Sequence, residues 1–195
     1  MDIGSIAVIV LRLAIPFSIL RYPLAGIIAC LTLDYVDTGL VDILGGRYGF
    51  GSEAIDYQHL DKVLDIYYLA FAFVVSLRWE NPLARRTSII LFSQRFVGIA
   101  LFLLTGWRTF LFIFPNIFEY FLVFYLITQR FFPRFRLEKI SHLVIVLLII
   151  GVPKVFHEYA LHYLFMGTAD MLNAFTPLKI EESTLWDWMK ARFLR

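Results

Sequence analysis

The sequence has a single cysteine, Cys30, and charged residues make up only 17% of its 195 residues. One cysteine excludes an internal disulfide framework. Hydrophobic residues account for 59% of the chain and the mean hydropathy is +0.72, which is more apolar surface than a soluble domain of this length can bury. The composition therefore predicts a multi-pass integral protein of the cell or inner membrane.

The chain also lacks a signal-peptide pattern, internal repeats and low-complexity tracts. Its first residues, "MDIGS", contain no basic segment, and no small-residue cleavage site follows, so we expect the first apolar run to remain as a membrane helix. The apolar runs do not alternate with polar residues as barrel strands do, and only helices or closed barrels satisfy their own backbone hydrogen bonds in lipid. The sequence predicts an all-α polytopic bundle that forms one transmembrane domain over residues 1–195.

Six apolar runs are candidate transmembrane helices, since one crossing needs roughly 20 mainly apolar residues. They cover about Ile6–Leu20, Tyr22–Val36, Leu60–Leu77, Ser88–Thr105, Phe110–Thr128 and Ile140–Phe165. The tail at 170–195 contains the amphipathic stretch "STLWDWMKARFLR", which predicts an interfacial helix. A soluble tail helix packed on the bundle is the alternative.

Several ionisable residues interrupt the apolar runs or lie at their ends. A charge near the bilayer centre costs roughly 2.5–3.5 kcal/mol, so we expect these side chains to face the bundle interior and pair with one another. Salt bridges that fix helix register are the simplest role. The residues are Arg12, Asp34, Arg95, Glu119, Lys154, His157 and Glu158.

Acidic residues are concentrated in one region, because seven of the sixteen lie between positions 34 and 65. Asp34 and Asp37 are spaced i, i+3, and Asp61 and Asp65 are spaced i, i+4, so each pair shares one helix face. If the second and third runs lie side by side, the four carboxylates converge at one membrane edge, where Mg²⁺ or Mn²⁺ would relieve their repulsion. A solvated acidic loop is the alternative interpretation.

The two aspartate pairs carry a family resemblance. "DYVD" at 34–37 followed by "DKVLD" at 61–65 resembles the D-x-x-D and D-x-x-x-D core of the CDP-alcohol phosphotransferase (CDP-alcohol phosphatidyltransferase) motif. "VLRLAIP" at 10–16 resembles the opening of the family's first helix, and "SQRF" at 93–96 lies where members often have an arginine. The resemblance extends over roughly the first 110 residues of the chain.

The resemblance implies a phosphotransferase that moves a substituted phosphoryl group from a CDP-linked or related pyrophosphate donor to a hydroxyl acceptor in phospholipid-type synthesis. It implies Mg²⁺ or Mn²⁺ on the four aspartates, with Asp61 and Asp65 catalytic and Asp65 also the candidate base. We expect a small or lipid-linked phosphate substrate and membrane lipid as partners, leave a homodimer or membrane complex open, and expect no nucleic acid. The candidate substrate-binding residues are Arg47, Lys62, Arg95, Arg108 and Gly39, the last as part of a glycine-rich phosphate-contacting loop.

Some motif positions differ from the family. Thr38 and Tyr57 stand where the motif has glycines, and Val41 and Asp42 stand where it has Ala-Arg. These differences favour the alternative function, a non-catalytic or degenerate membrane subunit of the same fold that binds a partner protein or lipid. A transporter is a third hypothesis, which predicts a binding site at mid-membrane between broken helices.

"PKVFHEYALH" at 153–162 is a second polar group. His157 and His162 are five residues apart and diverge by roughly 140° around a helix, which disfavours the zinc site of an H-E-x-x-H protease. Glu158 is spaced i, i+4 from both Lys154 and His162, so the pattern predicts local pairs.

Charge also predicts the orientation. Eight basic residues flank the runs on the side away from the aspartates, and the positive-inside rule then puts the aspartates outside the cytoplasm. An enzyme that used cytosolic CDP-linked donors would need them inside, so either the nucleotide substrate is lost or the number of spans is off by one. The eight are Arg21, Arg78, Arg85, Arg86, Arg130, Arg134, Arg136 and Lys139.

Overall fold

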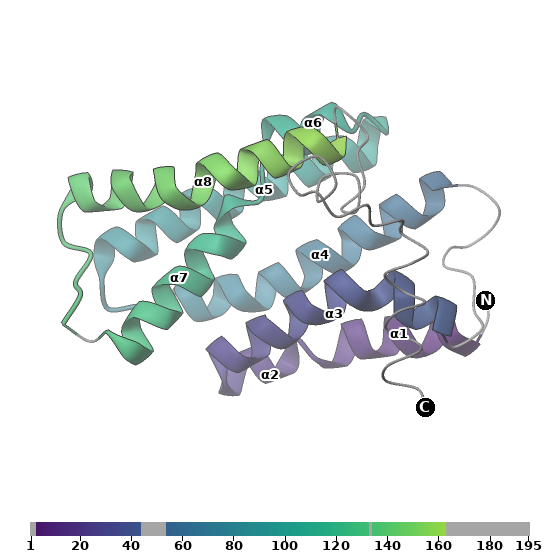
Figure 1. Ribbon diagram of the computed structural model, residues 1–195, viewed down its shortest axis with the longest axis horizontal. Helices are drawn as coiled ribbons and strands as arrows, with labels where there is room; N and C mark the ends of the chain where they lie inside the picture. Colours follow the sequence, from purple (N-terminus) through teal and green to yellow (C-terminus); the bar gives the residue numbers. More distant parts are fainter. Residues whose placement is uncertain (1–2, 44–53, 133, 163–195) are drawn as a thin grey trace, which may run out of the picture.

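The computed structural model describes residues 3–43, 54–132 and 134–162, and every regular element in these ranges is a helix. This confirms the all-α fold class, whereas the expected helix in the tail at 170–195 lies outside the described residues. Figure 1 shows the arrangement. The elements are α1 (Ile3–Ala14), α2 (Phe17–Arg21), α3 (Pro23–Ile43), α4 (Ala54–Ser76), α5 (Pro82–Thr105), α6 (Thr109–Ile113), α7 (Ile117–Phe131) and α8 (Ile140–His162).

Four helical segments of the described chain are long and apolar enough to cross a membrane: Ile3–Arg21, Pro82–Thr105, Thr109–Phe131 and Ile140–Tyr159. The chain is therefore a membrane protein built on helices. The crossings expected at about 22–36 and 60–77 coincide with α3 and α4, which are long helices but are not among these four.

Prolines divide two of the apolar segments. Pro16 separates α1 from α2, and Pro115 separates α6 from α7, because proline has no N–H for the helical ladder. Asn116 then begins α7 by accepting a hydrogen bond from the Glu119 N–H. The break at Pro115 was not predicted, so the apolar run alone gave one helix where the structure has two.

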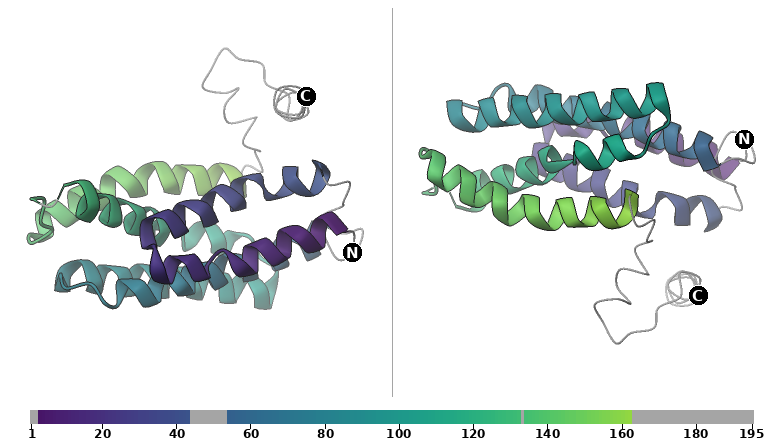
Figure 2. Two further views of the ribbon diagram at one scale, coloured as in Figure 1. Left: turned by 90° about the horizontal axis from the view of Figure 1, so that it is seen from below. Right: turned by 90° about the horizontal axis from the view of Figure 1, so that it is seen from above.

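The helices pack around one main core. Figures 1 and 2 show α3 running alongside α1 and α2, with α4 beside them, and α8 on the far side of the bundle against α6 and α7. A side chain at Gly26 would lie 2.6 Å from the Ile19 nitrogen, which explains how α3 can approach α2 so closely. The core contains the fully buried Ile27, Leu69 and Phe121.

The apolar segment of α8 is the most exposed of the four, since only about a tenth of its apolar stretch is buried. Large apolar side chains such as Ile145, Ile149 and Val152 are exposed along it. An apolar helix surface of this kind is stable against lipid tails and not against water. The exposure therefore agrees with the membrane character that the composition predicts.

Candidate metal centre between α3 and α4

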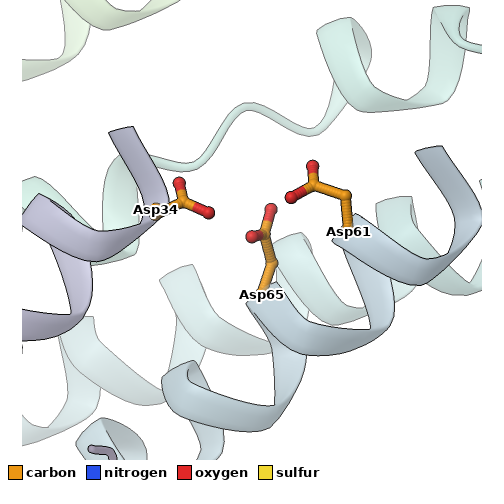
Figure 3. A group of neighbouring side chains, drawn as sticks. All are labelled: Asp34, Asp61 and Asp65. Atoms are coloured by element: carbon orange, nitrogen blue, oxygen red, sulfur yellow. The ribbon is translucent and has the colours of Figure 1, made fainter. Parts of the chain in front are cut away.

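The four aspartates converge, as their spacing predicts. Asp34 and Asp37 lie on α3, Asp61 and Asp65 lie on α4, and Figure 3 shows Asp34 reaching across to the two aspartates of α4. One carboxylate oxygen each of Asp34, Asp61 and Asp65 lies within 4.8 Å of the others. Among the described residues, these three side chains are spaced closely enough to hold one metal ion.

The sequence predicts the aspartate pairs at helix ends, but in the structure they lie within helices. Helix α3 continues beyond Asp37 to Ile43, and α4 begins at Ala54, before Asp61. The apolar runs end near the aspartates, but a helix continues for as long as its backbone bonds are made, whatever the polarity of its side chains. Residues 54–59, which precede the third apolar run, are therefore helical, and so is Gly39, which we assigned to a phosphate-contacting loop.

Arg12 of α1 lies at the centre of the cluster. Its Nη1 donates to Asp37 Oδ2 at 2.5 Å and Asp61 Oδ1 at 2.8 Å. Its Nη2 donates to Asp34 Oδ1 at 2.6 Å and Asp65 Oδ1 at 2.9 Å. The planar guanidinium presents several donors in a fixed fork, so one side chain binds four carboxylates and joins three helices.

Lys62 is the second cation. Its Nζ lies 2.7 Å from Asp61 Oδ2 and 2.6 Å from Asp65 Oδ2. With four carboxylates and two cations, these six side chains keep a formal charge of −2, which is the charge that one divalent ion neutralises. We define the acidic cluster as Arg12, Asp34, Asp37, Asp61, Lys62 and Asp65.

Burial is uneven across the acidic cluster. The side chains of Asp37 and Asp65 are 2% and 6% exposed, whereas those of Asp34 and Asp61 are 30% and 16% exposed. Solvent therefore reaches the cluster on the side of Asp34 and Asp61. An ion or a phosphate would enter from that side, because the other two carboxylates are enclosed by protein.

The other predicted substrate-binding residues are distributed differently. Arg95 is 2% exposed and its Nη1 donates to the Leu111 carbonyl at 3.3 Å and the Phe114 carbonyl at 3.0 Å, so it ties α5 to the α6 segment. It still lies near enough to Lys62 for the two charges to interact, and its buried Nε has no hydrogen-bond partner in the described structure. Arg108 directly precedes α6, and Arg47 lies outside the described residues.

A neighbouring polar group was missed by the sequence analysis. Tyr68 lies three residues after Asp65 on α4, and its hydroxyl donates to Glu119 Oε2 at 2.6 Å. Asn116 Nδ2 donates to the same oxygen at 2.5 Å. Glu119 was recognised as an interior charge, but no spacing in the sequence relates it to a residue 51 positions earlier.

The polar residues of α8 follow the predicted local pairing in part. Lys154 Nζ lies 3.1 Å from Glu158 Oε1, which confirms that i, i+4 pair. The side chain of His162 lies outside the described residues, so its predicted pair with Glu158 stays a prediction.

The chain was also compared with known proteins. No protein-family model matches it, and no curated protein or solved structure matches it significantly. The geometry of the acidic cluster and its surroundings is therefore the basis for assigning a function.

Proposed function

We propose that the chain is an integral-membrane, divalent-metal-dependent phosphotransferase of the CDP-alcohol type. It would move a substituted phosphoryl group from a CDP-linked or related pyrophosphate donor to the hydroxyl group of a small or lipid-linked acceptor. In this proposal α3 and α4 cross the membrane with the four apolar segments, which gives about six transmembrane helices, and an interfacial helix follows at 170–195.

The observation that carries the proposal is the convergence of four carboxylates whose charge the two cations do not neutralise. Carboxylate oxygens are the ligands that Mg²⁺ and Mn²⁺ prefer. Opposite ligands of an octahedral Mg²⁺ are about 4.2 Å apart, because each bond is about 2.1 Å long. The three oxygens within 4.8 Å of one another fit such an ion after small side-chain movements.

The proposed roles follow from exposure and partners. Asp34 and Asp61 are the more exposed carboxylates and would hold the ion, which neutralises developing charge on the transferred group. Both oxygens of Asp65 accept from cations, so its action as a base requires Lys62 to leave it for the incoming phosphate. The unpartnered Nε of Arg95 supports a role in holding a substrate phosphate.

The experiment measures ion binding before activity. Electron paramagnetic resonance of Mn²⁺ added to the purified chain in detergent should show at least one bound ion that Mg²⁺ displaces. Asp61→Asn should weaken Mn²⁺ binding at least tenfold, whereas Glu138→Gln, which removes an exposed carboxylate outside the acidic cluster, should leave it unchanged. Release of CMP from CDP-diacylglycerol in the presence of a hydroxyl acceptor should require the same ion and should be lost in Asp61→Asn.

The alternative function is a non-catalytic membrane subunit of the same fold. It is favoured by one observation, that Arg12 already binds all four carboxylates. The acidic cluster would then only fasten α1 to α3 and α4. Absence of Mn²⁺ binding by the wild-type chain would contradict the phosphotransferase proposal and favour this alternative.

A further inference from the structure

The connection between α4 and α5 lies beside the connection between α7 and α8, at one end of the bundle (Figures 1 and 2, left). The Asn81 side chain holds them together: its Nδ2 donates to the Leu137 carbonyl at 2.9 Å, and its Oδ1 accepts from the first amides of α5. The end of α4 at Ser76 is roughly 17 Å from Asp65, at a rise of about 1.5 Å per residue. It is therefore separate from the acidic cluster.

A cavity of about 660 Å³ lies between the two connections. Arg78 and Glu80 line it from one connection and Arg136 and Glu138 from the other. The rings of Trp79 and Tyr125 form part of its wall, with centroids 4.1 Å apart. Gln129 adds an amide group to the lining. The lining thus combines two guanidinium groups, two carboxylates and amide groups with an aromatic wall, and Asn81 fixes the spacing of the connections that carry them.

The surroundings of the cavity are strongly basic. Glu80 and Glu138 balance Arg78 and Arg136 within the lining, but five further exposed basic residues lie on the same helix ends and connections, so seven exposed basic residues face two exposed acidic ones. The ion pair between Arg136 and Glu138 is 3.8 Å long, and the two side chains are 78% and 67% exposed. Solvent screens such a pair, so it neutralises little of the positive charge of Arg136. The basic residues are Arg78, Arg85, Arg86, Arg130, Arg134, Arg136 and Lys139.

Exposed aromatic rings place this end at the membrane surface. Phe131 and Phe132 are 65% and 60% exposed, and Phe135 is exposed as well, in the segment that also carries Arg134 and Arg136. Aromatic rings interleaved with arginine favour the interface between lipid and water over bulk water. Three of the four apolar segments begin or end here, so a membrane crossed by these segments would place the cavity at the level of the phospholipid headgroups.

We infer that this cavity binds the headgroup of an anionic phospholipid, with the lipid phosphate held by Arg78 and Arg136. Basic pockets between membrane helices select anionic lipids. Each nearby arginine attracts the net negative charge of an anionic headgroup, whereas a zwitterionic headgroup has no net charge. The net positive charge and the exposed phenylalanines favour a lipid phosphate over a soluble one. The site is independent of the proposed phosphotransferase function, since none of its residues belongs to the acidic cluster.

Native mass spectrometry of the full chain in detergent, titrated with dioleoylphosphatidylglycerol or dioleoylphosphatidylcholine, tests the inference. The wild type should bind one phosphatidylglycerol at least tenfold more tightly than phosphatidylcholine. The double variant Arg78→Gln/Arg136→Gln should lose roughly fivefold for each arginine, so roughly 25-fold in all. The matched control, Arg85→Gln/Arg130→Gln, removes the same charge from exposed residues outside the cavity lining and should lose less than about threefold on the same scale.

Three results would overturn the inference: equal affinity for the two lipids, equal losses in the two double variants, or displacement of the lipid by millimolar glycerol 3-phosphate. The second would show diffuse surface attraction, and the third a soluble phosphate ligand. If the Arg78→Gln/Arg136→Gln variant is not monodisperse, Arg136→Gln alone replaces it, because that side chain is 78% exposed and its loss leaves no buried group unpaired.

Discussion

Replacing Arg12 by glutamine should destabilise the protein strongly, because its guanidinium is 4% exposed and binds four carboxylates. Adding four separate hydrogen-bond energies would overestimate the loss, since Asp34 can be rehydrated at 30% exposure. The side chains of Asp37 and Asp65 are only 2% and 6% exposed, so water cannot rehydrate them. Removing one partner from a buried ion pair costs about 3–5 kcal/mol, so we expect about 4 kcal/mol.

The free energy of unfolding can be measured by titrating SDS into detergent micelles containing the chain, first with EDTA and then with Mg²⁺. Arg12→Gln changes the formal charge of the acidic cluster from −2 to −3, which should strengthen cation binding. At a Mg²⁺ concentration about 100 times the dissociation constant, binding should restore about 2.7 kcal/mol. Arg136→Gln is the control, and its exposed side chain should change the free energy by less than about 0.5 kcal/mol.

A loss below about 1 kcal/mol in EDTA would refute the reasoning, because Arg12 would then not hold the helices together. A loss of the expected size without recovery in Mg²⁺ would keep the structural role of Arg12 and contradict the metal site. The two measurements therefore separate the proposed phosphotransferase from its non-catalytic alternative.

Two further substitutions probe the packing and the buried hydrogen bonds of the helix bundle. Gly98→Ala should lower the free energy of unfolding by about 1–3 kcal/mol, because the added methyl group would overlap Phe114. Gly151→Ala is the control, since its methyl group has room and should not destabilise the protein. Equal effects of the two substitutions in the same SDS titration would contradict this prediction. Tyr68→Phe should cost about 1.5–3 kcal/mol by removing a hydrogen bond to the buried Glu119, and an unchanged titration midpoint would show that the bond contributes nothing.

Helix content was predictable because apolar runs in lipid have to satisfy their backbone internally. Helix limits were not, as α3 and α4 show. Both helices extend past the apolar runs into polar sequence, and the expected boundaries at about Val36 and Leu60 are wrong by several residues. Hydrophobicity reports where a segment contacts lipid, whereas helix ends depend on where backbone hydrogen bonds stop.

The convergence of the aspartates was predictable because i, i+3 and i, i+4 spacings fix a helix face locally. Their partner was not. Arg12 lies between 22 and 53 residues from the four carboxylates along the chain, and only tertiary packing decides which interior charges meet. The same reason explains Arg95, whose Nη1 donates to two carbonyls of the segment after α5, contacts that no spacing in the sequence predicts.

The acidic cluster and the basic end constrain the orientation of the protein together. Anionic lipids and the positive-inside rule both favour the basic end on the cytoplasmic side, because lysine and arginine in short loops are retained there. Of the exposed side of the acidic cluster, Asp34 lies at the middle of α3 and Asp61 lies in the half of α4 away from that end. A donor that reaches them from the cytoplasm would have to pass the half of α3 and α4 that lies nearer the basic end. The orientation therefore favours a donor presented from the opposite membrane surface, whether it is CDP-linked or a related pyrophosphate.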